Sequence, residues 1–128
     1  RVLAVRPPAA DGVVAAFASA IANRQQPIIF GNGKQTRDFI FIDDVIDALA
    51  RAHNRGGGLV INVGTGTQTS IEELWNLMAL GTTLQVRKEP VRSGDLQRLA
   101  VSPVRARIQL GWSSWTSLTD GVEALLDR

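Results

Sequence analysis

The chain of 128 residues contains no cysteine, no tyrosine and one histidine, His53. Without cysteine it can form neither a disulfide nor a thiolate metal site, and it has no cysteine nucleophile. A single histidine excludes a metal site built from several histidine ligands. Because tyrosine is absent, no tyrosine of this sequence can serve as a catalytic acid or base.

Charge of one sign is not in large excess either. The sequence has 14 Lys and Arg against 12 Asp and Glu, for a net charge of +2, although its pI is 9.9. The basic residues are interleaved with acids, which disfavours a nucleic-acid partner. Arginine suits forked recognition of phosphate or carboxylate oxygens, but a guanine- and cytosine-rich gene would produce the same arginine bias.

Long apolar runs are missing as well. No run approaches the ~18–20 residues of a membrane span, and the first residues do not have the pattern of a signal peptide. We therefore expect a cytoplasmic protein without a membrane partner.

Short apolar runs alternate with amphipathic segments along the whole chain. Because strands that alternate with helices are typical of α/β proteins, we expect one α/β domain over residues 1–128. The predicted strands are 1–5, 28–30, 39–42 and 59–63, with an edge strand at 84–86. The predicted helices start near Asp11, Asp43 or Asp44, Ser70, Ser102 and Thr116 or Ser117, and the first four end before Pro27, Gly56, Gly81 and Gly111.

Several local signals set these boundaries. Ser70 and Glu73 form the S-x-x-E pattern of a capping box. Gly31-Asn32-Gly33 predicts a turn with positive φ. Helical spacing predicts two core faces, and Asp47 with Arg51 forms an exposed pair one turn apart. The core faces consist of Val14, Phe17, Ala18 and Ile21 in the first helix and of Val45, Ile46, Leu49 and Ala52 in the second.

Three motifs invite a functional reading that their context does not support. Gly31 to Gln35 lacks the first glycine and the Ser or Thr of a phosphate loop, and the Gly64-Thr65-Gly66 turn lacks the third glycine of a dinucleotide fingerprint. Asp43-Asp44-Val45-Ile46-Asp47 has the D-D-x-x-D spacing of a magnesium–diphosphate site, but helix capping explains these acids better. His53 lies at a helix end, where a capping or surface role is favoured over catalysis. We expect no catalytic residue, cofactor site or metal site in this chain.

Three polar elements have no evident structural purpose. Gln35-Thr36-Arg37-Asp38 lies between two strands, Arg92-Ser93-Gly94-Asp95 lies in a loop, and Arg87, Lys88 and Arg98 surround that loop. Two separated arginines that converge on one ligand would form a diphosphate clamp, with Asp95 accepting a sugar or ribose hydroxyl. The alternative is that both arginines are solvated surface residues.

The order of these motifs resembles one family, the extended short-chain dehydrogenases that include NAD-dependent nucleotide-sugar epimerases and dehydratases such as UDP-glucose 4-epimerase. The similarity covers nearly the whole chain and corresponds to the C-terminal portion of such enzymes. It rests on Pro27 to Val45, Asn62-Val63-Gly64-Thr65-Gly66, Ser70-Ile71-Glu72-Glu73-Leu74, Arg92-Ser93-Gly94-Asp95 and Leu110-Gly111-Trp112.

The resemblance implies a substrate-binding C-terminal lobe of a Rossmann-type epimerase. It implies that the backbone of the strand from Ile28 to Phe30 holds the nucleotide base. It further implies that Arg37, next to Gln35, and the loop with Arg92 and Asp95 grip the diphosphate and ribose. The expected ligand is a nucleotide-sugar such as UDP-glucose.

Departures from the family pattern limit what the chain can do. The Gly-rich NAD loop and the catalytic Y-x-x-x-K pair are absent, and so is the N-terminal dinucleotide-binding half. Val2, Ala4, Ser93 and Ser102 replace residues that are usually Tyr, Asn, Pro and Asp. We therefore expect a truncated lobe that binds no NAD and does not turn over alone. The alternative is a non-catalytic, self-associating interaction module that pairs with a second copy or with the missing Rossmann half.

Overall fold

The computed structural model describes residues 2–3 and 12–128. Predictions that concern Asp11 as a helix cap, Ala4 as a replaced substrate contact and the rest of the strand at 1–5 lie outside the described residues.

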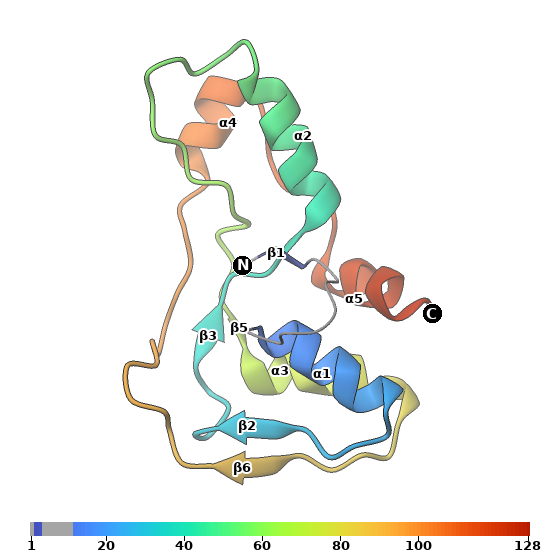
Figure 1. The fold of residues 1–128 in the computed structure, drawn as a ribbon. Coiled ribbons are helices and arrows are strands. Elements are labelled where there is room, and N and C mark those ends of the chain that lie inside the picture. The colour runs from blue at the N-terminus through green and yellow to red at the C-terminus, as the bar shows by residue number, and fades with distance from the viewer. Residues whose placement is uncertain (1, 4–11) are drawn as a thin grey trace.

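Five α-helices and six short strands make up the described part of the chain (Figure 1). The strand and helix order is mixed, which confirms the α/β class in its coarse form. The elements are β1 (Val2–Leu3), α1 (Val13–Ala22), β2 (Ile28–Phe30), β3 (Thr36–Arg37), β4 (Ile40–Phe41), α2 (Ile42–Ala52), β5 (Thr69–Ser70), α3 (Ile71–Met78), the short 3₁₀ helix η1 (Ala79–Gly81), β6 (Arg87–Glu89), α4 (Val104–Leu110) and α5 (Leu118–Leu126).

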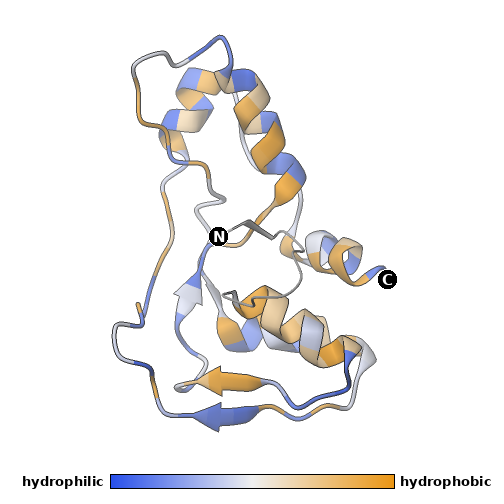
Figure 2. Ribbon diagram, in the orientation of Figure 1, coloured by the Kyte–Doolittle hydropathy of each residue, from blue (hydrophilic) through white to orange (hydrophobic). Residues whose placement is uncertain are grey.

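A first apolar core lies where α1, α3 and α5 pack beside β2 (Figures 1 and 2). The rings of Phe17 and Trp75 meet edge to face at 5.1 Å between centroids, an arrangement that aromatic pairs prefer. The predicted face of α1 is confirmed, since Phe17 is buried and Val14, Ala18 and Ile21 pack against this core. The buried members are Phe17, Ile29, Phe39, Ile71, Leu74, Trp75, Met78 and Val122.

A second, smaller core joins α2 to α4 in the upper part of Figure 1. It is built from Ile40, Ala48, Ala106, Leu110 and Trp112. The Trp112 indole donates a hydrogen bond of 2.9 Å to the backbone carbonyl of Asp44. This contact satisfies the polar end of a ring that is otherwise buried among apolar side chains.

The strands pair two by two. β1 pairs with β4 and β2 with β6, both in parallel, whereas β3 pairs antiparallel with β5. The strand predicted at 39–42 is shorter, because α2 begins at Ile42 directly after β4. The edge strand predicted at 84–86 is wrong by three residues, since hydrogen bonding to β2 begins at the amide of Arg87.

The strand predicted at 59–63 does not form within the described residues. A strand needs a partner for its backbone groups, and here the side chain of Arg105 donates to the Val60 carbonyl at 2.8 Å. Leu59 and Val60 are exposed. The apolar run therefore lies extended beside α4 as a loop.

Helix α2 differs from the sequence prediction in its cap and in its buried face. Its N-cap is Phe41, so Asp43 and Asp44 lie in the first turn rather than at the cap. Ile46 and Leu49, predicted to be in the core, are 54% and 64% exposed, and Ala52 is exposed too. The helix instead buries Asp44 and Ala48, because the small alanine allows a close approach to α4.

Most of the other local signals are confirmed. Ser70 and Glu73 form the predicted capping box at the start of α3. Gly31 and Gly33 have φ values of 85° and 77°, and α4 ends at Gly111 in the left-handed region. The remaining cap and pair predictions also hold: Ser117 caps α5, His53 is the C-cap of α2, and Asp47 pairs with Arg51 at 3.0 Å. At α4, Pro103 is the N-cap rather than the first helical residue.

No helix among the described residues is long and apolar enough to cross a lipid bilayer.

Candidate functional site

A pocket of about 220 Å³ opens between the start of α1, strand β2, Arg37 of β3 and the loop that follows β6. The structure brings all six sequence-predicted binding residues to this one pocket, although they come from separate parts of the chain. These residues are Ile28, Phe30, Gln35, Arg37, Arg92 and Asp95. Their role in binding stays a prediction, while their common location is a property of the fold.

Strand β2 turns toward this side the edge that has no paired strand in the described part of the chain. The carbonyl of Pro27 and the amide of Gly31 bond to β6 at 2.9 and 2.7 Å. Backbone groups of alternate residues in a parallel strand point to opposite edges, so those of Ile28 and Phe30 point away from β6. Gln35 Nε2 donates to the Phe30 carbonyl at 2.7 Å and holds this edge in place. The edge can pair with a planar ring that carries neighbouring donors and acceptors.

Arg37 lines the pocket and is largely buried, with its side chain 15% exposed. Its Nη1 donates to the carbonyls of Thr36 at 2.8 Å and of Leu96 at 2.7 Å. Its Nη2 lies 3.5 Å from Oδ1 of Asp95, whose side chain is 30% exposed. The guanidinium thus connects β3 to the loop and also contributes positive charge to the pocket.

Arg92, in the loop after β6, also lines the pocket and is exposed. Its guanidinium carbon lies 3.8 Å from the centre of the Phe30 ring, a cation–π contact. Because the guanidinium lies over the ring, its N–H groups remain available at its edge for an anion. Two arginines and one aspartate therefore line the pocket, which makes it net positive.

The first turn of α1 completes the wall through Gly12, Val13 and Ala16. Gly12 is the N-cap and has no side chain to accept from the first helical amides. The positive end of the helix dipole at this turn favours an anion in the same pocket. Neither these residues nor Ile71 were identified from the sequence, since only the tertiary fold places them beside β2.

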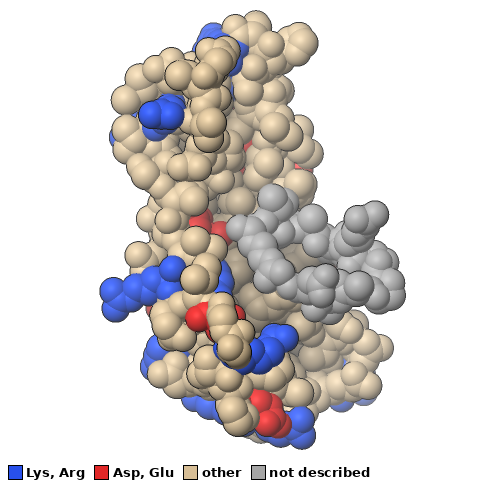
Figure 3. Space-filling model, turned by 60° about the vertical axis from the view of Figure 1, so that its left-hand side comes forward, with Lys and Arg blue, Asp and Glu red and all other residues tan. Residues whose placement is uncertain are grey.

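Charges near the pocket are mixed over the wider surface. Figure 3 shows basic and acidic side chains next to one another over the lower half of one face. Lys34 pairs with Glu72 at 2.6 Å. The hydrogen bond and charge of Glu72 raise the pKa of Lys34, and Lys34 in turn lowers the pKa of the Glu72 carboxyl.

The D-D-x-x-D segment does not gather its carboxylates into one site. The Asp44 carboxylate is buried and accepts from the amides of Trp115 and Thr116 at 3.0 Å and from the Thr116 hydroxyl at 2.7 Å. Asp47 pairs with Arg51 on the helix surface. Across residues 12–128 no group of three or more His, Asp or Glu side chains is placed to hold a metal ion.

A dinucleotide phosphate does not fit the Gly64-Thr65-Gly66 turn. The amides of Thr65 and Gly66 donate to the carboxylate of Asp38 at 3.0 and 2.9 Å, so they are not available for a phosphate. A Cβ at position 64 would also collide with Val101. Asp38, which belongs to the polar segment 35–38 but was not predicted as a binding residue, is therefore a structural anchor for this turn.

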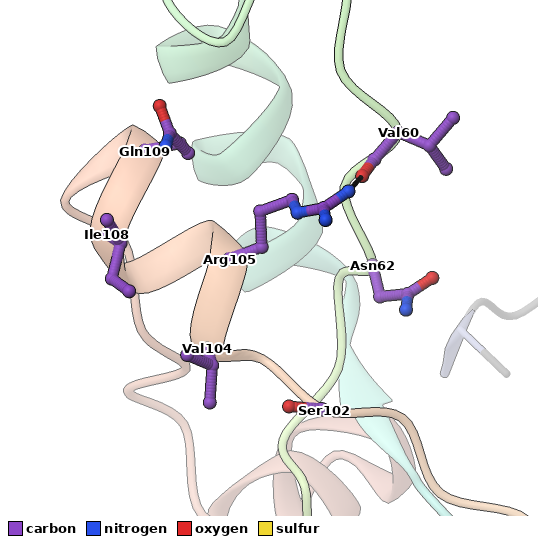
Figure 4. A pocket seen from close by; sticks show the side chains of 7 residues that line it. All are labelled: Val60, Asn62, Ser102, Val104, Arg105, Ile108 and Gln109. Carbon is purple, nitrogen blue, oxygen red and sulfur yellow. Dashed lines mark hydrogen bonds between the residues drawn. The ribbon is translucent and has the colours of Figure 1, made fainter.

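A second, larger hollow of about 490 Å³ lies between α4 and residues 60–62 (Figure 4). None of the six predicted binding residues lines it. Its wall combines apolar side chains with Arg105, which reaches across to the Val60 carbonyl (Figure 4).

Comparison with known proteins connects this fold to one family. The sequence model of GDP-mannose 4,6-dehydratase matches residues 9–125. UDP-glucose 4-epimerase of Mycolicibacterium smegmatis is 43% identical over 114 residues, which cover 87% of this chain and 36% of that protein.

Two solved structures are also similar. The crystal structure of UDP-glucose 4-epimerase with UDP-glucose from Thermotoga maritima is 31% identical, with a TM-score of 0.91 over 95% of this chain and 40% of the other. The Bacillus cereus UDP-glucuronic acid 4-epimerase, in complex with UDP-glucuronic acid and NAD, is 29% identical, with a TM-score of 0.84 over 91% and 39% of the two chains. This chain thus spans well under half the length of these relatives. The match over residues 9–125 and the shared fold establish that the chain belongs to the GDP-mannose 4,6-dehydratase family, as a partial homologue of its NAD-dependent UDP-glucose 4-epimerases.

Proposed function

We propose that this chain is a single domain, the nucleotide-sugar-binding lobe of an NAD-dependent sugar epimerase or dehydratase. The observation that carries the proposal is the meeting of Arg37 and Arg92 at one pocket, next to the free edge of β2. A nucleoside diphosphate offers the matching chemistry, because it joins a planar base to two phosphates that carry negative charge.

Each part of such a ligand has a counterpart in the pocket. The base pairs with the backbone edge at Ile28 and Phe30. The diphosphate lies toward Arg92, Arg37 and the positive end of α1, and Asp95 accepts a ribose hydroxyl. UDP-glucose is the ligand we propose, since relatives of known structure hold UDP-sugars.

We further propose that this chain supplies binding and orientation but not the reaction itself. Hydride transfer needs a nicotinamide cofactor and a proton-transferring residue beside it. The amides of the Gly64-Thr65-Gly66 turn already bond to Asp38, and the sequence contains no tyrosine. The residues present therefore do not fit NAD. Incubation with UDP-glucose and NAD should leave UDP-glucose unchanged, and formation of an epimerised product would disprove this part.

Calorimetry on the 128-residue protein tests the binding proposal. UDP and UDP-glucose should bind, and Arg92→Ala should weaken the affinity for UDP about 10- to 100-fold, the range expected for loss of a charge-assisted contact. Arg98→Ala is the matched control, because Arg98 is an exposed arginine that does not line the pocket. Parallel titrations with dTDP and GDP identify the preferred base. Absence of binding to all four nucleotides would reject the proposal.

Self-association is a second candidate function, which the hollow in Figure 4 favours. Val60 and Ile108 are 82% and 70% exposed, and Val104 also points into this region. Exposed apolar side chains that cluster in this way are typical of association surfaces. The occupant we propose is a second copy of the chain.

Sedimentation velocity at micromolar concentrations tests this candidate. The wild-type protein should sediment as an oligomer, and Val60→Asp with Ile108→Asp should convert it to a monomer. Leu80→Asp is the control, since Leu80 is equally apolar and exposed but lies on η1. A wild-type monomer at all concentrations would reject self-association and leave the binding proposal untouched.

A further inference from the structure

The two pocket arginines differ in how they are held. The two Nη1 hydrogens of Arg37 point to two backbone carbonyls, those of Thr36 and Leu96, and Nη2 faces the Asp95 carboxylate. Three of the five guanidinium N–H groups are therefore directed at protein acceptors. A side chain bound at so many points, and only 15% exposed, is held in one orientation in the ligand-free protein.

The contacts of Arg37 connect one loop to β3. Leu96 and Asp95 belong to the loop after β6, and the backbone of Thr36 bonds to that loop on both sides, from its amide to the Gln97 carbonyl at 2.8 Å and from the Leu99 amide to its carbonyl at 3.1 Å. Residues 92–99 otherwise lie mainly on the surface, and a Cβ at Gly94 would have no neighbour within 4 Å. The Arg37 side chain thus adds two contacts, to Leu96 and Asp95, to the backbone bonds that hold this loop against β3.

Arg92 is held in the opposite way. Among the described residues it contacts the face of the Phe30 ring, which attracts the cation but leaves its N–H groups unused. The side chain is exposed and can turn toward an anion without breaking a hydrogen bond to Phe30. Its attachment point, however, is in the loop that Arg37 secures.

We infer that Arg37, besides the positive charge it adds to the pocket, is a positioning residue that preorders loop 92–99, the loop from which Arg92 reaches the diphosphate. Ordering the loop before the ligand arrives removes an entropic cost from binding. The same Arg37 contacts place Asp95 at the pocket wall. The inference about Arg37 concerns the ligand-free protein, whereas the assignment of Arg92 rests on the proposed function.

Substitution by lysine separates the two roles, because lysine keeps the charge but cannot reach two carbonyls and a carboxylate at once. Hydrogen–deuterium exchange of the ligand-free protein should show at least about tenfold faster exchange for the peptide containing Leu99 in Arg37→Lys and Arg37→Gln, since a loss of ~1.4 kcal/mol of protection is tenfold. Arg92→Lys should leave that exchange unchanged. Helix α5 is the internal control for correct folding.

A further variant keeps the test decisive if loss of Arg37 disturbs the whole fold. Asp95→Asn retains both carbonyl contacts of Arg37, so exchange at Leu99 should rise by less than in Arg37→Lys. Wild-type exchange at Leu99 in both Arg37 variants would overturn the positioning role, and so would a larger increase in Asp95→Asn.

Titration with UDP then tests separately whether Arg92 contacts the diphosphate. Both lysine variants should bind UDP more weakly, but only Arg37→Lys should also show the loosened loop before UDP is added. If Arg37→Lys loosens the loop and no form of the protein binds UDP, the proposed function fails while the positioning role stands. If UDP binds and Arg92→Lys and Arg92→Ala retain wild-type affinity, the assignment of Arg92 is wrong.

Discussion

The guanidinium carbon of Arg92 lies 3.8 Å from the centre of the Phe30 ring. This contact joins the loop after β6 to the last residue of β2, two segments that also flank the candidate binding pocket. An exposed cation–π pair contributes about 0.5–1 kcal/mol, enough to favour the position in which Arg92 lies over the ring and offers the N–H groups at its edge to an anion.

Replacing Phe30 should therefore weaken nucleotide binding without unfolding the protein. Phe30→Leu removes the ring under Arg92, and we expect a ~2- to 5-fold loss of UDP affinity, in line with a cation–π energy of ~0.5–1 kcal/mol. Phe30→Tyr keeps the ring and should bind normally. Calorimetry measures both variants, and equal affinity in Phe30→Leu and wild type would contradict the role of the stack.

Asp44 should be the most sensitive acidic residue for stability. Its carboxylate is fully buried and accepts three hydrogen bonds from Trp115 and Thr116, so Asp44→Ala removes all three bonds and leaves a cavity beside these donors. We expect a loss of ~3 kcal/mol or more in the free energy of unfolding, measured by urea denaturation. Asp47→Asn, on the exposed face of the same helix, should change it by less than ~0.5 kcal/mol. A cost below ~1 kcal/mol for Asp44→Ala would refute this prediction.

Position 64 should tolerate no side chain. A Cβ on Gly64 would collide with Cγ2 of Val101 and would lie 2.9 Å from Oδ2 of Asp38, so Gly64→Ala should cost ~1–3 kcal/mol in unfolding free energy. Adding Val101→Ala should recover part of this loss, because it removes the colliding methyl group. Gly57→Ala is the control, since a Cβ there has no neighbour within 4 Å. Equal stability of both single variants would show that the turn can move aside.

The exposed pair of Lys34 and Glu72 predicts a pH window for one small stabilising contribution. The pKa of Glu72 is lowered from 4.5 on folding, so its contribution is present above 4.5 and is lost as the pH falls through the lowered value. The pKa of Lys34 is raised from 10.5, so its contribution is present below 10.5 and is lost as the pH rises through the raised value.

A double-mutant cycle with Lys34→Met and Glu72→Gln measures this coupling. Between about pH 5 and pH 10 we expect a constant, salt-sensitive coupling, because the pair is exposed. It should disappear in strong acid and in strong alkali. A coupling that persists in strong acid would contradict the assignment to the charged pair.

Local sequence signals determined much of the secondary structure. The Ser70–Glu73 capping box and the glycines of the 31–33 turn each depend on residues within a few positions of one another. The apolar spacing of α1 also sufficed, because one face of that helix packs on the main core. Such features follow from backbone geometry and nearest neighbours, so the sequence predicts them well.

Where the predictions were wrong, contacts between residues distant in sequence determined the local structure. Residues 59–63 have the composition of a strand but no strand beside them, and Arg105 takes the carbonyl of Val60 instead. Asp44 has the pattern of a helix cap but faces inward, because Trp115 and Thr116 bring three donors to it. Periodicity reports that a face is apolar, but it cannot identify what will cover that face, as Ile46 and Leu49 show.

The same division applies to the candidate site. The sequence by itself identified the family and six candidate residues, because motif order along a chain is a one-dimensional property. Only the tertiary structure decided that these residues meet in one pocket and that Arg37 bonds to the carbonyls of Thr36 and Leu96 while Arg92 lies over the Phe30 ring. Hydrogen-bond geometry between segments far apart in sequence exists only once the chain has folded, so the different roles of two identical side chains are set there.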